Sequence, residues 1–249
     1  MKNISIFAFS LLILFSACKK DDPIQIPEAV SKKLTGFTYE NNQYAPETIE
    51  YDAQGRVSRY VGSEDITTFT YLGNEVTISE WRLTENREVF NFKGQLNAKG
   101  NIYKGSGTAK YIAGTTNQED YTFEYDANEY MIRETRNINQ GASSYVFDYT
   151  YNSDGNLSEY KVYYNGDYSY GGSWVYDTSK KEKTGLNWQQ FVGPNTFTGK
   201  TNQHMAIKYT GNTGWYVDMS YTYDNQGYPS SNTQKYSNGN TSKLFYIFK

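Results

Sequence analysis

Histidine and cysteine, on which most nucleophilic and metal chemistry depends, are scarce in this sequence. It contains one histidine, His204, and one cysteine, Cys18. A zinc site takes three or four protein ligands, and a serine or cysteine nucleophile needs a base beside it. Neither arrangement is supported, and we interpret His204, between Gln203 and Met205, as a histidine at a strand edge. The sequence predicts no catalytic residue, no metal site and no cofactor.

Paired carboxylates are the remaining source of catalysis, because two carboxyl groups can hydrolyse a glycosidic bond. Glu124 and Asp126 share one face of a candidate strand, and Glu85 and Glu88 flank an Asn-Arg turn. Such pairs arise in any sheet with a polar face, and no other group completes a site. We therefore predict that the protein is not an enzyme.

Two glycine-containing stretches resemble ligand-binding loops but lack their spacing. A calcium loop of the EF type has its glycine at position six and a glutamate at twelve, whereas Asn152, Asp154 and Gly155 fall at positions one, three and four. Gly105-Ser106-Gly107 lacks the third glycine and the following helix of a phosphate loop. A plain turn is the better interpretation of the Asp154-Gly155 stretch.

Aromatic side chains offer more chemistry, since the chain has 26 tyrosines, 13 phenylalanines and 4 tryptophans. The stretch 160–176 holds six tyrosines and Trp174, interleaved with Gly166, Gly171 and Gly172. Glycines beside aromatic residues can leave the rings exposed, and planar rings suit the faces of sugars or acyl chains. The alternative is that this stretch forms two ordinary hairpin arms.

A second stretch, 179–203, interrupts the regular pattern of the chain. Such insertions often carry function, and Trp188 and Phe191 within this one either bind a ligand or plug the open end of the sheet, which we favour. The predicted ligand-binding residues of both stretches are Tyr163, Tyr168, Tyr170, Trp174, Trp188 and Phe191.

β-Strands must position these rings. Along 145–151, Tyr145, Phe147, Tyr149 and Tyr151 alternate with more polar residues, so that one face of a strand is a row of aromatics. Asp154-Gly155 then supplies a tight turn and a second strand follows. Variants of this unit recur at 48–57, 69–76, 96–102, 121–130 and 217–227.

The pattern predicts an all-β protein and, from residue 34 onward, no convincing helix. The candidate strands are 34–40, 46–52, 56–61, 66–72, 75–82, 87–93, 108–113, 119–126, 129–136, 144–152, 156–164, 168–177, 203–210, 215–224, 228–236 and 241–248. Short connections dictate an antiparallel meander of about 14–18 strands, curled into a barrel-like or open-faced curved sheet. Because tyrosine hydroxyls need partners, we expect a wet or partly open interior.

The N-terminus has the features of a secretory signal. Lys2 precedes an apolar run from Ile4 to Phe15, which is too short for a spanning helix of about twenty residues. Phe15-Ser16-Ala17-Cys18 resembles the lipobox of bacterial lipoproteins. The resemblance implies removal of residues 1–17 and acylation of Cys18, so that residues 18–33 form a linker and residues 34–249 a single β-domain.

The repeated unit also carries a resemblance. Tyr51-Asp52-Ala53-Gln54-Gly55-Arg56-Val57 resembles the YD repeat of Rhs-type and teneurin-like proteins, and Tyr223-Asp224-Asn225-Gln226-Gly227 matches its first half. In that family the repeat is structural. The whole layout is similar to Gram-negative surface lipoproteins with a porin-like YD-repeat domain, some of which are described as lipid-binding. This similarity implies a lipid anchor in the outer membrane and, with Lys19-Lys20-Asp21-Asp22 following the cysteine, exposure at the cell surface.

The charge of the chain limits the classes of partner that it can bind. A net charge of −3 offers no basic surface for nucleic acid, and we expect a monomer. A membrane-spanning barrel fits the length and the aromatic run 244–248, which we expect to be buried on both faces. However, the outward positions carry charges where such a barrel needs an apolar band. We predict non-catalytic binding of an apolar or amphiphilic, lipid-like ligand; the alternatives are glycan binding and a structural or adhesive envelope module.

Overall fold

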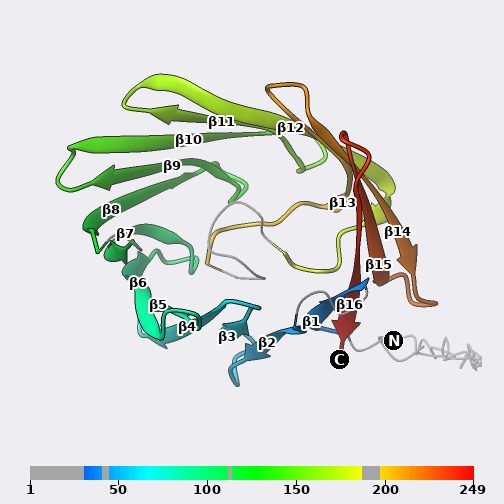
Figure 1. The fold of residues 1–249 in the computed structure, drawn as a ribbon, viewed down its shortest axis with the longest axis horizontal. Coiled ribbons are helices and arrows are strands. Elements are labelled where there is room, and N and C mark those ends of the chain that lie inside the picture. The colour runs from blue at the N-terminus through cyan, green and yellow to red at the C-terminus, as the bar shows by residue number, and fades with distance from the viewer. Residues whose placement is uncertain (1–30, 41–44, 112–113, 187–196) are drawn as a thin grey trace, which may run out of the picture. The chain divides into compact units, whose positions relative to one another are not determined.

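The chain forms a closed antiparallel barrel in a computed structural model, which describes residues 31–40, 45–111, 114–186 and 197–249. Each strand pairs with its neighbours in sequence, and β1 pairs with β16 to close the sheet (Figure 1). Residues 32–249 form one compact unit. The predicted all-β meander is confirmed, and the sheet is closed rather than open-faced.

Sixteen strands make up the barrel. They are β1 (Leu34–Tyr39), β2 (Glu47–Tyr51), β3 (Val57–Val61), β4 (Asp65–Leu72), β5 (Glu75–Arg82), β6 (Arg87–Leu96), β7 (Ile102–Lys110), β8 (Thr116–Tyr125), β9 (Met131–Ile138), β10 (Ser143–Tyr151), β11 (Leu157–Tyr164), β12 (Asp167–Lys181), β13 (His204–Gly211), β14 (Tyr216–Tyr223), β15 (Pro229–Tyr236) and β16 (Thr241–Phe248). Among the residues that the structure describes, no helix has the length and apolarity that a membrane span requires.

The two ends of the barrel differ. At one end, called here the terminal end, the backbones of Lys33 and Lys249 hydrogen-bond to each other where the chain enters and leaves the barrel. The connections β2–β3, β4–β5, β6–β7, β8–β9, β10–β11, β12–β13 and β14–β15 also lie at this end because the meander alternates. The opposite, distal end carries the other connections.

Five connections at the terminal end share one turn geometry. The first residue of each turn is Asp52, Asn97, Asp126, Asn152 or Asp224, and its Oδ1 accepts hydrogen bonds from the backbone N–H groups two and four residues later. The fourth residue has positive φ in every case, between 73° and 83°. Aspartate and asparagine are equivalent here because both supply the accepting oxygen, so the degenerate repeats of the sequence build the same turn.

One predicted strand is misplaced. The sequence pattern predicts a strand over 108–113, whereas β7 runs from Ile102 to Lys110. Gly105 and Gly107 hide the alternation because both lie close against the neighbouring strand β6. A Cβ atom at 105 would lie 2.3 Å from Cζ of the buried Phe92 ring, and one at 107 would lie 2.3 Å from the Asn91 carbonyl oxygen. Gly105 thus makes room for a ring and Gly107 for the backbone of that strand, and the pair does not form a phosphate loop.

The described flanks of the β12–β13 connection, 182–186 and 197–203, run into the barrel interior (Figure 1). Phe197 is buried against Phe69 and Tyr71, and its carbonyl accepts a hydrogen bond from the Ile102 backbone. Leu186 is also part of the hydrophobic core. We call the described flanks, 182–186 and 197–203, the plug. Trp188 and Phe191 lie outside the described residues, so that their role at the open end stays a prediction.

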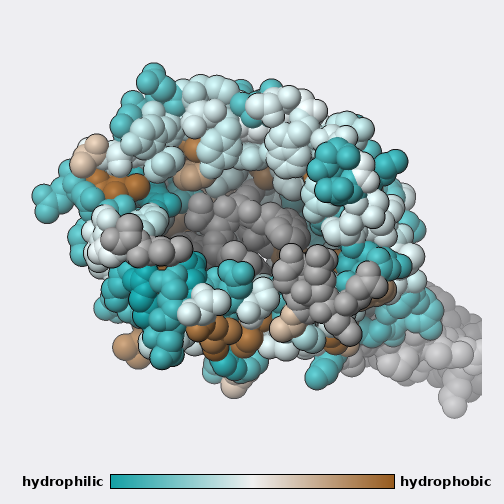
Figure 2. All heavy atoms as spheres, in the orientation of Figure 1, coloured by the Kyte–Doolittle hydropathy of each residue, from teal (hydrophilic) through white to brown (hydrophobic). Residues whose placement is uncertain are grey.

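The outer wall of the barrel is polar. Ion pairs lie on it between neighbouring strands at several places around the circumference, including Arg59–Glu50, Arg133–Asp148 and Lys208–Asp218. On the face that Figure 2 shows, hydrophobic residues form only small separate patches. The C-terminal run departs from expectation: Phe245 and Ile247 are 36% and 39% exposed, so β16 is buried on one face only.

Candidate functional site

An aromatic cavity of about 490 Å³ lies inside the barrel toward the distal end. Strands β10 to β15 and the β13–β14 turn line it, because their inward parity is rich in rings. Eight of its lining side chains are aromatic: Phe147, Tyr149, Tyr160, Tyr170, Trp174, Tyr209, Trp215 and Tyr236. Leu157, Val217, Met219 and Gln234 complete the wall. This volume lies within the range of about 300–1,000 Å³ that small-molecule sites occupy.

Tyr209 is the centre of the aromatic wall. Its ring stacks on Tyr160 and lies 4.6 Å from the Trp174 ring and 5.0 Å from the Trp215 ring, between centroids. Its hydroxyl group shares a 2.8 Å hydrogen bond with that of Tyr160. Sequence reasoning missed Tyr209, since nothing in β13 marks it out and its partners are distant in sequence.

Two glycines create the space for these rings. Tyr160 is the cross-strand partner of Gly172, and Gly172 is that of Gly211. A Cβ atom at 172 would lie 2.4 Å from the Tyr209 hydroxyl oxygen, and one at 211 would lie 2.4 Å from Trp215 Nε1. Gly172 thus makes room for the ring of Tyr209 on the neighbouring strand, and that ring is 8% exposed.

A smaller space of about 130 Å³, the floor pocket, adjoins the aromatic cavity on its terminal side. The two share the side chains of Leu157, Trp174, Met219 and Gln234. The rest of the floor pocket is more polar, and its lining includes His204, Asn232 and residues of the plug. The interior therefore combines a wide aromatic part with a narrow part whose lining includes polar side chains.

His204 is the first residue of β13, where it is buried and structurally fixed. Asn156 Oδ1 accepts hydrogen bonds from the backbone N–H groups of Gln203 and His204, which fixes the orientation of the Asn156 amide. The Asn156 Nδ2 group then donates to His204 Nδ1 at 3.0 Å. We assign the ring proton to Nε2 on this basis, because Nδ1 must accept.

A charged cluster lies in the wall beside the aromatic cavity. Arg136 pairs with the fully buried Glu119 at 2.5 Å. Glu134, also fully buried, lies beside the cavity residue Tyr149. Burial raises the pKa of Glu134 to about 8, against the smaller lowering effects of Arg136 and Tyr149. The Glu134 carboxyl group in this wall is therefore mainly protonated and uncharged at neutral pH.

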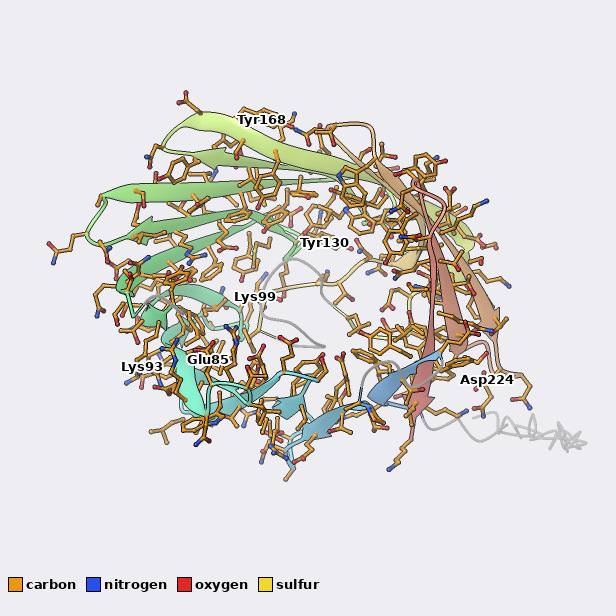
Figure 3. All side chains as sticks on the ribbon, in the orientation of Figure 1. Glu85, Lys93, Lys99, Tyr130, Tyr168 and Asp224 are labelled. Carbon is orange, nitrogen blue, oxygen red and sulfur yellow. The ribbon has the colours of Figure 1, made fainter. Side chains whose placement is uncertain are left out.

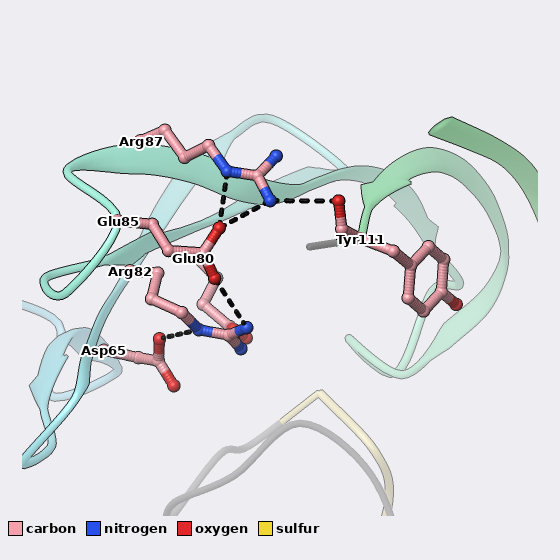
Figure 4. Close-up of polar contacts among 6 residues, drawn as sticks. All are labelled: Asp65, Glu80, Arg82, Glu85, Arg87 and Tyr111. Atoms are coloured by element: carbon pink, nitrogen blue, oxygen red, sulfur yellow. Dashed lines mark hydrogen bonds and ion pairs between the residues drawn. The ribbon is translucent and has the colours of Figure 1, made fainter. Parts of the chain in front are cut away.

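Glu85 and Glu88, one of the two carboxylate pairs considered as catalytic candidates, have structural partners. At the distal end, Glu85 accepts hydrogen bonds from Arg82 and Arg87, and Arg87 also donates to the Tyr111 carbonyl (Figure 4). The Arg87 hydrogen bond is the main cause that lowers the pKa of Glu85. Glu88 accepts hydrogen bonds from Asn91 and Ser79, whose contacts lower its pKa in the same way.

The structure divides the predicted ligand residues between two faces. Tyr170 and Trp174 line the aromatic cavity. Tyr163 and Tyr168 pair with each other on the outer face, where Tyr168 is 51% exposed (Figure 3). A bulge in β12 at this pair reverses the parity between 168 and 170, so the four residues do not form one surface. Trp188, Phe191 and Cys18 lie outside the described residues.

Comparisons with known proteins define the fold. No protein-family model matches the chain, and no curated protein does. Among solved structures, a porin-like protein from Bacteroides uniformis is 18% identical, with a TM-score of 0.66 over 88% of this chain and 97% of that one. A porin-like protein from Bacteroides vulgatus is 15% identical, with a TM-score of 0.62 over 88% and 99%. The chain has the fold of these porin-like barrels; YD-repeat and lipoprotein status remain predictions.

Proposed function

We propose that this chain is a lipid-anchored protein of the outer membrane that holds an apolar or amphiphilic ligand inside its barrel without catalysis. The aromatic cavity carries this proposal, because a space of about 490 Å³ is lined by eight aromatic rings and three aliphatic side chains. Transfer of apolar surface from water to such a wall is favourable by about 25 cal/mol per Å². The hydroxyl pair of Tyr160 and Tyr209 is internally satisfied, which leaves the ring faces for the ligand.

An anchor outside the barrel suits its surface better than a spanning role. A lipid-facing wall needs a continuous apolar band about 25 Å tall, whereas ion pairs such as Arg133–Asp148 and Lys208–Asp218 lie on the outside of this one. The porin-like fold of the neighbours is compatible with an outer-membrane location. Lipidation at Cys18 supplies the attachment in this proposal, and mass spectrometry of the membrane-extracted protein tests it directly.

The binding test makes the same change, valine to tryptophan, at two positions on opposite faces of the barrel wall. Val217 is buried and lines the aromatic cavity, whereas Val175 is 52% exposed on the outside. Val217→Trp places a large ring in the cavity and is expected to abolish uptake of an apolar fluorescent dye by delipidated protein. Val175→Trp is the matched control and is expected to leave uptake unchanged.

Circular dichroism confirms that both variants fold, and native mass spectrometry detects any small molecule that co-purifies with the wild type. A folded wild-type protein with no dye uptake and no co-purifying molecule would remove the proposal. So would uptake that persists unchanged in the folded Val217→Trp variant.

Glycan binding is a second candidate because rings are accessible at the distal mouth. Tyr164, Tyr170 and Trp215 are each between 42% and 46% exposed, and such rings stack on sugar faces. This candidate predicts glycan-array binding that Trp215→Ala weakens, and an array without hits would exclude it. A structural role with an envelope-protein partner predicts instead that neither dye nor glycan binds.

A further inference from the structure

The floor pocket contains polar groups that the protein leaves without partners. Within the described part of the chain, Trp174 Nε1 and Asn232 Oδ1 are buried and have no hydrogen-bond partner. Asn232 as a whole is only 3% exposed. Both residues line the floor pocket, and Trp174 also lines the aromatic cavity. An unpaired buried polar group costs about 1–3 kcal/mol, so these two atoms indicate an occupant.

The two atoms define the chemistry of that occupant. The indole Nε1 only donates and the amide Oδ1 only accepts, and a hydroxyl group carries both the acceptor and the donor that these atoms lack. His204 adds a second donor to the lining, because Asn156 fixes its proton on Nε2. The pocket therefore complements a hydroxyl-bearing head.

The charged side chains around the floor pocket are engaged elsewhere, which argues against a charged head. The Glu182 carboxylate accepts hydrogen bonds from the backbone N–H and hydroxyl of Thr184 and from the backbone N–H of Gly185. Lys200 is exposed, and its ammonium group lies 5.8 Å from the centre of the Tyr130 ring. Within the described lining, no cationic side chain is therefore directed into the pocket, where it would pair with a carboxylate or phosphate head group of a ligand.

We propose that the floor pocket binds the neutral, hydroxyl-bearing head of an amphiphile whose hydrocarbon part occupies the aromatic cavity. This inference rests on the proposed function and adds the class of ligand and its orientation, head toward the terminal end. The two spaces adjoin at the shared side chains of Leu157, Trp174, Met219 and Gln234, which places the head and the hydrocarbon part of such a molecule in neighbouring spaces. Ordered water is the alternative occupant, since it also pairs with a donor and an acceptor.

The test displaces an apolar dye from delipidated protein with three ligands of equal chain length: dodecan-1-ol, its methyl ether and dodecanoate. The wild type is expected to bind the alcohol about tenfold more tightly than the ether, which corresponds to about 1.4 kcal/mol. Trp174→Phe removes the N–H group but keeps an aromatic ring, and Asn232→Leu removes the accepting oxygen. Either change is expected to reduce the preference to about twofold or less.

Trp215→Phe is the matched control, because Trp215 lines the aromatic cavity and not the floor pocket. It is expected to leave the preference for the alcohol intact. If the wild type takes up the dye but prefers the ether or the carboxylate, or if the preference survives both floor-pocket variants, water alone fills the pocket and the inference fails. Absence of dye uptake by the folded wild type would instead overturn the proposed function itself.

Discussion

Ionisation of Glu134 is expected to govern both the stability of the barrel and the charge beside its cavity. Glu134 lies on the inward face of β9, paired across the sheet with Phe123 on one side and Phe147 on the other. Its exposed fraction is 0%. A charge in this position is poorly solvated, which is the dominant reason that its pKa is raised from 4.5 to about 8.

The size of the effect follows from this shift. Between the unfolded and folded pKa values the unfolded chain has lost the proton and the folded chain retains it, so stability falls as pH rises. The slope is about 1.4 kcal/mol per pH unit. A displacement of roughly 3.5 pH units amounts to about 5 kcal/mol, of which about 3 kcal/mol is already lost at pH 7. The contribution is fully present below about pH 4.5 and is lost as pH rises through about 8.

Glu134→Gln keeps the shape of the side chain and removes the titration. Urea unfolding from pH 4 to pH 9.5 should show that the variant gains stability relative to wild type across this range, by about 5 kcal/mol in total. Glu124→Gln is the control, because Glu124 is exposed on the adjacent strand β8, and its difference from wild type should not change in this way. A parallel pH profile for Glu134→Gln and wild type would refute the reasoning.

Three further predictions concern the ligand and the turns. Dye affinity of the wild type should fall above about pH 8, and that of Glu134→Gln should not, because ionised Glu134 places a charge behind the cavity residue Tyr149; equal profiles would disprove the coupling. Gly100→Ala should lower the free energy of unfolding by about 1–2 kcal/mol, through the positive φ of Gly100 alone. Gly155→Ala should lower it further, since a Cβ atom at 155 would also lie 2.2 Å from the Tyr130 hydroxyl oxygen. Equal losses for the two variants in urea unfolding would contradict this difference. Glu129→Gly should raise the thermal midpoint by about 2–4 °C, because Glu129 has a φ of 73°; an unchanged or lower midpoint in calorimetry would show that side-chain contacts outweigh the backbone strain.

Strand parity and turn chemistry were readable from the sequence because both are local. Alternation of aromatic and polar residues indicated the strands. An aspartate followed three residues later by a glycine indicated the turns at Asp52 and Asp224, and these glycines have positive φ. The bounds of β7 were not predicted because its glycines make room for atoms of Asn91 and Phe92 on the adjacent strand. A local pattern does not record which ring lies across the sheet.

The candidate site was only partly predictable, since it depends on contacts between distant residues. Of the residues predicted to bind a ligand, Tyr170 and Trp174 line the aromatic cavity, but the bulge that turns Tyr168 outward has no local signal. Tyr209 joins Tyr160 from 49 residues away, and Asn156 fixes His204 from 48 residues away. Only the closed sheet brings these pairs together, so single-sequence reasoning identified the kind of side chain and missed the partners.

The position of the cavity follows from how the lumen is filled. A barrel of sixteen strands is too wide for one layer of inward side chains to fill, so the plug must occupy part of it. Phe197 and Leu186 join a core whose buried members come from β1 to β11 and β16, and β12 to β15, although fully described, contribute none of these buried members. On that side glycines lie against large inward rings, since Gly172 leaves room for Tyr209 and Gly211 leaves room for Trp215. The unfilled volume therefore lies against β10 to β15, where eight of the twelve lining side chains are aromatic.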